Sequence, residues 1–156
     1  MRINKYRVEL DDDRLNTLVK ESGTNYAAEK RLDNPGKIVR MLNTVYGLNR
    51  QAEENVYLIG FDAKMKPLGV FEVSHGAANL TVCNPREIFI RALLCGAVNI
   101  TLCHNHPSGD CSPSEEDISC FHRAKEAGKI IGVKLVDFII DGDRDYYSFS
   151  ENGLNK

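Results

Sequence analysis

Two histidines separated by one residue, His104 and His106, have the types and spacing of metal ligands. A β-rich run precedes them, and residues two apart in a strand point to the same side, so both imidazoles can converge on one ion. A short loop rich in Pro, Ser and Gly follows and returns to a helix start that could present Asp117 beside them. Two imidazoles and one carboxylate leave a fourth tetrahedral position for water, which is typical of catalytic zinc.

Such a zinc ion would lower the pKa of its water to about 7 and make hydroxide available at neutral pH. A His-x-His pair alone is a weak indication, and the loop and helix start that follow it strengthen the prediction. Ser114 and Asp117 also have the spacing of a helix capping box, and the capping and metal-site interpretations are compatible.

Other polar side chains near the motif receive structural interpretations. His75 precedes a glycine and is interpreted as a turn residue, and His122 as a helix-surface residue, because neither has ligand spacing. Cys103 should point away from the metal if His104 and His106 share a face, which predicts a core thiol. The five cysteines contain no Cys-x-x-Cys pair, fit neither a disulfide framework nor a thiolate zinc site, and favour a reducing, cytoplasmic setting.

The elements that must position these side chains follow from cap signals and hydrophobic periodicity. Helices are predicted to begin after Asn34, Asn84 and Ser114, and to end near glycines. Strands are predicted over 56–61, 68–73, 98–103, 133–140 and 146–149. This order predicts an α/β (α+β) fold with a mixed β-sheet flanked by helices.

The remaining residues, 1–33, are polar, and only 6–10 alternate like a strand, so we expect a short, weakly structured extension or a short edge element. Residues 34–156 are expected to form the main domain, since 156 residues suit one domain of ordinary size. The net charge of −2 gives no general attraction to a phosphate backbone. The longest apolar run, 92–98, is too short to cross a membrane, and no secretory signal is present, so a soluble cytoplasmic protein is expected.

The spacing of the candidate ligands also resembles a known family. His104-x-His106-Pro107, with Ser114 eight residues after His106 and Asp117 three further on, resembles the JAMM motif of MPN/JAB-domain metalloproteases. Neighbouring stretches over 84–89, 104–109, 113–118 and 128–132 resemble the bacterial RadC-like branch, and the resemblance runs from about 34 to 153. It implies the JAB/MPN fold, whose architecture is similar to that of cytidine deaminases.

The resemblance assigns roles to particular residues. It implies that His104, His106 and Asp117 hold Zn²⁺ and that Ser114 helps to stabilise the oxyanion. The motif also needs a glutamate at the start of the first core strand, and Glu54 occupies that place as general acid/base, with Glu53 as the fallback. In the strand after the second helix the RadC-like pattern commonly has Asp-His, whereas this chain has Asp137 followed by Phe138.

The function implied is that of a zinc-dependent metallopeptidase-type hydrolase of amide or isopeptide bonds, acting on a peptide or a protein conjugate. The alternative is an accessory protein associated with DNA repair that carries a metal-binding JAB domain, because RadC-like proteins have traditionally carried that label. No autonomous DNA binding is expected, since residues 1–33 show no counterpart of the helix-hairpin-helix module of longer relatives. Nucleobase deamination is disfavoured because its Pro-Cys-x-x-Cys signature is absent.

Overall fold

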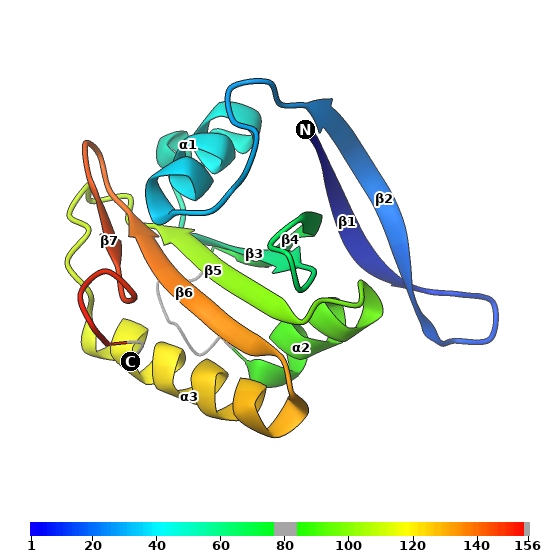
Figure 1. Ribbon diagram of the computed structural model, residues 1–156. Helices are drawn as coiled ribbons and strands as arrows, with labels where there is room; N and C mark the ends of the chain where they lie inside the picture. Colours follow the sequence, from blue (N-terminus) through cyan, green and yellow to red (C-terminus); the bar gives the residue numbers. More distant parts are fainter. Residues whose placement is uncertain (77–83, 155–156) are drawn as a thin grey trace.

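The computed structural model of this chain describes residues 1–76 and 84–154. Its strands are β1 (Arg2–Leu10), β2 (Asn16–Asn25), β3 (Asn55–Phe61), β4 (Pro67–His75), β5 (Asn99–Asn105), β6 (Lys134–Asp141) and β7 (Tyr146–Ser148). Its helices are α1 (Pro35–Tyr46), the 3-10 turn η1 (Leu48–Arg50), α2 (Pro85–Leu94) and α3 (Glu115–Ile131). The seven described strands form one sheet in the order β2-β1-β4-β3-β5-β6-β7 (Figure 1).

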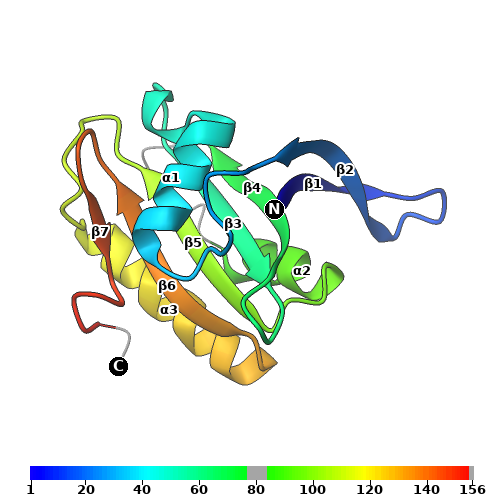
Figure 2. The ribbon, with the colours of Figure 1, turned by 45° about the horizontal axis from the view of Figure 1, so that its top comes forward.

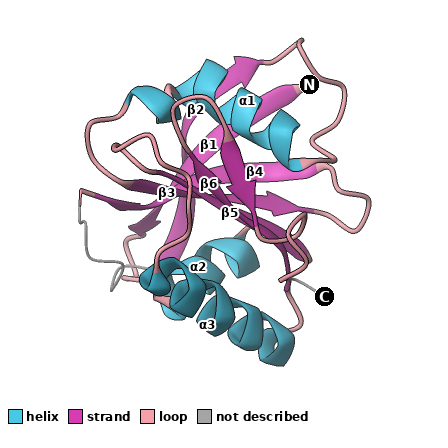
Figure 3. Cartoon of the chain, turned by 90° about the vertical axis from the view of Figure 1, so that its left-hand side faces the viewer, coloured by secondary structure: helices cyan, strands magenta, loops and turns pink. Residues whose placement is uncertain are grey.

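The helices cover both faces of this sheet, with α1 on one face and α2 and α3 on the other (Figure 3). Successive residues of the central strands point to opposite faces of the sheet and pack into two separate apolar cores. In β3, Ile59 packs in the core beneath α1, whereas Leu58 packs in the core beneath α2 and α3. The mixed sheet flanked by helices that the sequence predicts is therefore confirmed.

The predicted helix starts are also confirmed, together with their caps. The Asn34 side chain accepts a hydrogen bond from the backbone of Lys37, and α1 ends at Gly47 with a φ of 63°. The Asn84 side chain caps α2, and Ser114 caps α3. Each cap satisfies a backbone donor that the first helical turn leaves free, which fixes where the helix begins.

The N-terminal segment is more ordered than the sequence predicts. β1 and β2 pair antiparallel along nearly their whole length, and β1 joins the main sheet by parallel pairing with β4, where Lys5 lies opposite Val70. The hairpin extends away from the body of the molecule (Figure 2). Its strands carry few apolar residues because they form the sheet edge, so hydrophobic alternation detects only part of one of them. The division into 1–33 and 34–156 stays a prediction.

The cysteines require one correction. Cys95, Cys103 and Cys111 are free thiols, and Cys103 is fully buried in the core beneath α1, as predicted. Cys120 is disulfide-bonded, so the expectation of unpaired cysteines is wrong for this residue. Cys83 lies outside the described residues. Within the described part of the chain, no helix is long and apolar enough to cross a membrane.

Candidate metal centre

The two histidines lie at the end of β5, a central strand that is paired on both sides. His104 is opposite Val56 of β3 and Ile140 of β6, and the backbone N–H of His106 donates to the carbonyl of Asp141 at 2.9 Å. This pairing continues strand-like geometry through both residues, so their side chains project from the same face of the sheet. That face carries α3, where Asp117 occupies the first turn.

The four predicted site residues that carry imidazoles or carboxylates come together here. The two Nε2 atoms of His104 and His106 are 3.1 Å apart. Asp117 approaches both rings, with its Oδ1 atom 2.9 Å from His104 Nε2 and its Oδ2 atom 3.3 Å from His106 Nε2. Glu54 approaches from the start of β3, with its Oε1 atom 3.6 Å from His106 Nε2.

Asp117 is fixed in place by the capping box of α3. The Oδ2 atom of Asp117 accepts hydrogen bonds from the backbone N–H and the hydroxyl of Ser114, at 2.7 and 2.8 Å. In return, the backbone N–H of Asp117 donates to Ser114 Oγ at 3.1 Å. The capping interpretation is thus confirmed, and the same hydrogen bonds aim the carboxylate at the histidines.

The charge of Asp117 is maintained despite complete burial. Burial alone would raise the pKa of this carboxyl group, but the close imidazoles of His104 and then His106 outweigh it and hold the pKa well below its ordinary value. The interaction with Asp117 is in turn the largest cause of the raised pKa of His106. The site therefore holds a carboxylate anion against two imidazoles.

One atom indicates that the cluster suits an ion better than it suits hydrogen bonding. Asp117 Oδ1 lies close to His104 Nε2, yet it is buried and accepts no well-directed hydrogen bond from the described residues. One ligand atom from each of Glu54, His104 and His106 lies within 4.8 Å of the other two, so this His-His-Glu group could hold a metal ion. Imidazole and carboxylate ligands of this kind suit several divalent metals.

The two histidines are oriented by different means. The Nδ1 atom of His106 lies 2.7 Å from the backbone carbonyl of Asp110, and donating there leaves Nε2 free to bind a cation. The Nδ1 atom of His104 has no partner among the described residues. Its ring instead packs edge-on against Phe138, with the ring centroids 5.3 Å apart. Phe138, at the position where the resemblance implies a histidine, thus holds His104 by apolar contact.

The loop after His106 needs glycine to bring the Asp110 carbonyl back to the ring. A turn closes where the N–H of Gly109 donates to the carbonyl of His106, and Gly109 has a φ of 83°. A Cβ atom here would also lie 3.0 Å from the Cβ atom of Asp143. Both the backbone conformation and the space therefore favour glycine.

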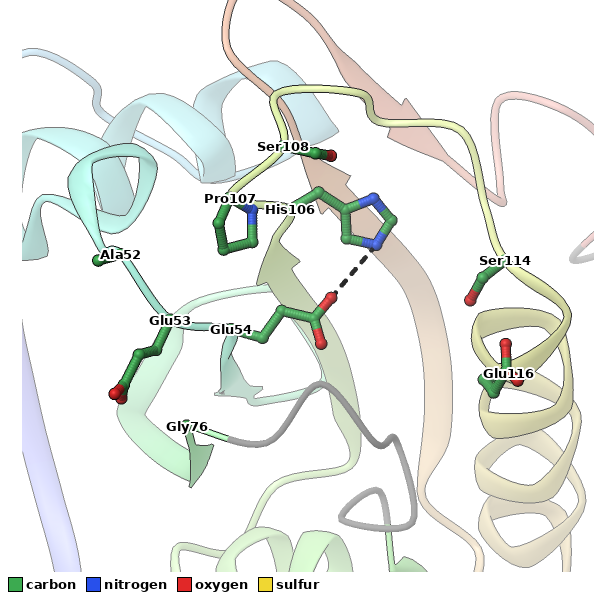
Figure 4. Close-up of a pocket in the computed structure, with 9 residues that line it drawn as sticks. All are labelled: Ala52, Glu53, Glu54, Gly76, His106, Pro107, Ser108, Ser114 and Glu116. Carbon is green, nitrogen blue, oxygen red and sulfur yellow. Dashed lines mark ion pairs between the residues drawn. The ribbon is translucent and has the colours of Figure 1, made fainter.

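A pocket of about 560 Å³ opens beside the histidines. Figure 4 shows Glu54, His106 and Ser114 around it, with Glu54 directed toward His106. The Glu54 side chain is 17% exposed, whereas those of His104 and Asp117 are 1% and 0% exposed and do not line the pocket. Of the two carboxylates, Glu54 is therefore the one that can meet both the histidines and a molecule in the pocket.

Glu53, the fallback for Glu54, points elsewhere. Its carboxylate is 2.8 Å from His75 Nε2, and its side chain is 57% exposed. His75 lies at the end of β4, not in a free turn, and it joins Glu53 on the rim of a separate shallow hollow. The structure thus brings Glu54, and not Glu53, to the histidines.

Asn105, between the two histidines, is a site residue that the sequence analysis did not identify. Its side chain is buried on the opposite face of β5 and bonds three backbone groups of the segment that carries Glu54. The Nδ2 atom donates to the carbonyls of Gln51 and Glu53 at 3.2 and 3.0 Å, and Oδ1 accepts from the N–H of Asn55 at 2.8 Å. The sequence does contain one signal for this role: strand alternation places Asn105 on a buried face, where a polar side chain needs hydrogen-bond partners.

Asn105→Asp is expected to lower the free energy of unfolding by about 2 to 4 kcal/mol, because two carbonyls lose their donor and a charge is placed at a buried position. Urea denaturation measures the change. The matched control is Asn99→Asp at the other end of β5, where one hydrogen bond to the carbonyl of Asp62 is lost. We call the three hydrogen bonds of Asn105 to the backbone around Glu54 a clamp. Equal destabilisation by the two variants would contradict this role of Asn105.

Asp141, at the end of β6, is a second buried polar residue beside the site. The residue is 3% exposed, and its Oδ2 atom has no hydrogen-bond partner among the described residues. Burial raises the pKa of Asp141 to about 6, opposed by a hydrogen bond from Asn43. The folded protein thus binds this proton more tightly than the unfolded chain does.

Because of Asp141, stability is expected to fall as the pH rises from about 4 to 6, by about 2 kcal/mol in metal-free protein. The contribution is fully present below the unfolded pKa and is lost as the folded group ionises. Asp141→Asn should remove this part of the slope, as measured by urea unfolding in EDTA at several pH values. Asp143→Asn, at an exposed neighbouring position, should keep the slope; an unchanged slope in Asp141→Asn would refute the assignment.

Comparison with known proteins identifies similar chains. The RadC-like JAB domain family matches residues 32–154. A UPF0758 protein of Clostridium perfringens is 35% identical over 137 residues, which cover 88% of this chain and 60% of the relative. A UPF0758 protein of Clostridium beijerinckii is 42% identical over 107 residues, covering 69% and 47% of the two chains. One of Pelobacter propionicus is 40% identical over 109 residues, covering 70% and 48%. The chain spans about half the length of these curated relatives.

Proposed function

Since the chain belongs to the RadC-like JAB domain family, we propose that it is a zinc-dependent hydrolase of amide or isopeptide bonds. The observation that carries the proposal is the convergence of His104, His106 and two carboxylates at the wall of a pocket. A JAB domain with a site that could hold a metal suggests a metallohydrolase. We further propose that the metal is zinc, that the bond cleaved is an amide or isopeptide bond, and that the substrate is a peptide or a protein conjugate.

We assign His104, His106 and Asp117 as the zinc ligands. All three are held by strand pairing or by the helix cap, and the ionised, buried Asp117 supplies the negative charge that a divalent cation requires. When bound, zinc would activate water as a nucleophile and polarise the carbonyl that is attacked.

Glu54 is assigned as the general acid/base. Its position in the pocket next to His106 supports this role, in which the carboxylate would accept a proton from a water molecule and pass it to the departing amine. The clamp formed by Asn105 fixes the backbone on both sides of Glu54, which restricts where the carboxylate can reach.

Ser114 is assigned as the group that stabilises the oxyanion. Its hydroxyl lines the pocket and donates to Asp117 in this structure. The hydroxyl can rotate toward a carbonyl oxygen in the pocket while the backbone N–H of Ser114 keeps its hydrogen bond to Asp117. A donor aimed at the developing charge is the largest single contribution in many acyl-transfer enzymes.

The acidic character of the pocket suits release of an amine. The carboxylates of Glu54 and Glu116 line it, whereas that of Glu53, also part of the lining, is paired with His75; among the described residues that line the pocket there is no Lys or Arg. A peptide or a protein conjugate that ends in a protonated amine after cleavage matches this charge.

The test is metal analysis of the purified chain combined with a hydrolysis assay. We expect one zinc per chain after dialysis, and the release of new primary amines from a panel of peptides and isopeptide-linked conjugates. Folded protein that takes up no zinc would refute the metal assignment. A zinc-loaded chain that cleaves no amide or isopeptide bond in the panel would refute the assigned reaction.

A further inference from the structure

A second hollow, here called the basic pocket, lies at the opposite end of β3 from Glu54. It is formed by the start of β1, the loop before α1 and the turn between β3 and β4, and its volume is about 780 Å³. Seven residues of β3 separate its turn from Glu54, so the two sites are roughly 20 Å apart. The basic pocket is thus distinct from the metal centre.

Five cationic side chains line the basic pocket: Arg2, Lys30, Arg31, Lys64 and Lys66. All five residues are exposed, and none of the described residues that line the basic pocket is Asp or Glu. Among the described residues, none of the five forms an ion pair; the pairs involve other cations, such as Lys5 and Arg40.

Two carboxylates near these cations offset part of their charge. Asp33 forms an ion pair with Lys37 at 2.6 Å and also interacts with Arg31, and Asp62 interacts with Lys64 and Lys66 while it accepts hydrogen bonds from their backbone. Five cations against these two carboxylates leave the hollow with an excess of positive charge in a chain whose net charge is −2. Such a concentration of like charge attracts a ligand of opposite sign.

The grouping of the five cations around one hollow favours an anion with concentrated charge. Five consecutive acidic residues in an extended peptide spread their charge over about 17 Å. Two or three adjacent phosphates concentrate about three to four negative charges in a much shorter length. The planar guanidinium groups of Arg2 and Arg31 can each bind phosphate oxygens in pairs.

An apolar wall accompanies the charge. Met65, Pro67 and Leu68 line the basic pocket beside the two lysines of the turn. A ligand with phosphates at one end and a flat, weakly polar group at the other would contact both parts. We propose that the basic pocket binds a nucleoside di- or triphosphate, with its phosphates among the five cations and its nucleoside against the apolar wall.

Calorimetric titration of the 156-residue chain with ATP, ADP and AMP, in low salt and EDTA, tests the proposal. Affinity should fall from ATP to ADP to AMP, by about tenfold or more overall, because each phosphate removed loses charge-assisted hydrogen bonds. Arg31→Gln and Lys66→Gln should each weaken ATP binding about fivefold to tenfold. Arg123→Gln, at an exposed position on α3, is the matched control and should bind ATP as the native chain does.

Several results would overturn the proposal. They are folded protein that does not bind ATP, equal affinity for ATP and AMP, and an Arg123→Gln variant that is weakened as much as Arg31→Gln. Tighter binding of pentaglutamate or of a single-stranded oligonucleotide through the same cations would replace the nucleotide by a peptide or by nucleic acid. His104→Ala should retain ATP binding, so failure of the proposed hydrolase function would leave this inference standing.

Discussion

Glu54→Gln is expected to lower the rate of hydrolysis by about 10²- to 10⁴-fold while the zinc content stays at one ion per chain. The amide keeps the shape of the side chain but cannot accept the proton that the carboxylate would take. Glu54 lines the pocket 3.6 Å from His106, whereas the three proposed ligands, His104, His106 and Asp117, are better buried and remain available to the ion. Turnover of a cleaved substrate and metal analysis of the same preparation measure the two quantities.

Glu53→Gln is the matched control, because it changes the same chemical group one residue earlier. Its carboxylate pairs with His75 and is largely exposed, so both turnover and zinc content should remain near those of the native chain. Loss of zinc from Glu54→Gln would instead make Glu54 a ligand, as the His-His-Glu grouping allows. A large loss of turnover in Glu53→Gln alone would reverse the assignment of the two glutamates.

Asp117→Asn is expected to weaken zinc binding by at least about 100-fold and to destabilise the metal-free protein by about 3 kcal/mol. The pKa of Asp117 is held well below its ordinary value, so its stabilising contribution is present above pH 4 and is lost as the pH falls through the folded pKa. At pH 7 the neutral amide therefore loses the full contribution. Competition with a chelating dye measures zinc affinity, and urea unfolding in EDTA measures stability.

The matched control for Asp117→Asn is Glu115→Gln, which neutralises an exposed carboxylate in the same first turn of α3. It should change stability by less than about 1 kcal/mol and leave zinc affinity intact, since only its interaction with the helix dipole is lost. If both variants lose stability equally, the effect of Asp117 comes from the helix end and not from the histidines.

Much of the scaffold could be predicted because its signals are local. Asn34 and Ser114 mark helix starts through hydrogen bonds to residues three positions away, and a glycine marks the end of α1. The convergence of His104 and His106 follows from strand periodicity alone. These features can be inferred from residues close together in the sequence, without information on contacts between distant segments.

What the sequence did not reveal depends on long-range pairing. The clamp formed by Asn105 joins groups about fifty residues apart, and the raised pKa of Asp141 depends on burial beneath other elements. The hairpin of β1 and β2 was predicted only in part, as a strand pattern over 6–10, because its stability comes from backbone pairing at an edge and not from a hydrophobic pattern. Strand alternation places Asn105 on a buried face, but it does not indicate which groups Asn105 bonds or that Asp141 holds a proton.

The capping box of α3 has a consequence for how the site assembles. Ser114 and Asp117 satisfy the helix end, and the same hydrogen bonds aim the carboxylate of Asp117, so the first turn of α3 also sets the position of a proposed ligand. A cation bound to Asp117 would then stabilise the first turn of α3. When the cation leaves, this turn is expected to fray before the rest of the helix. By thermodynamic linkage, a mutation that loosens this turn also weakens metal affinity, even if it touches no ligand.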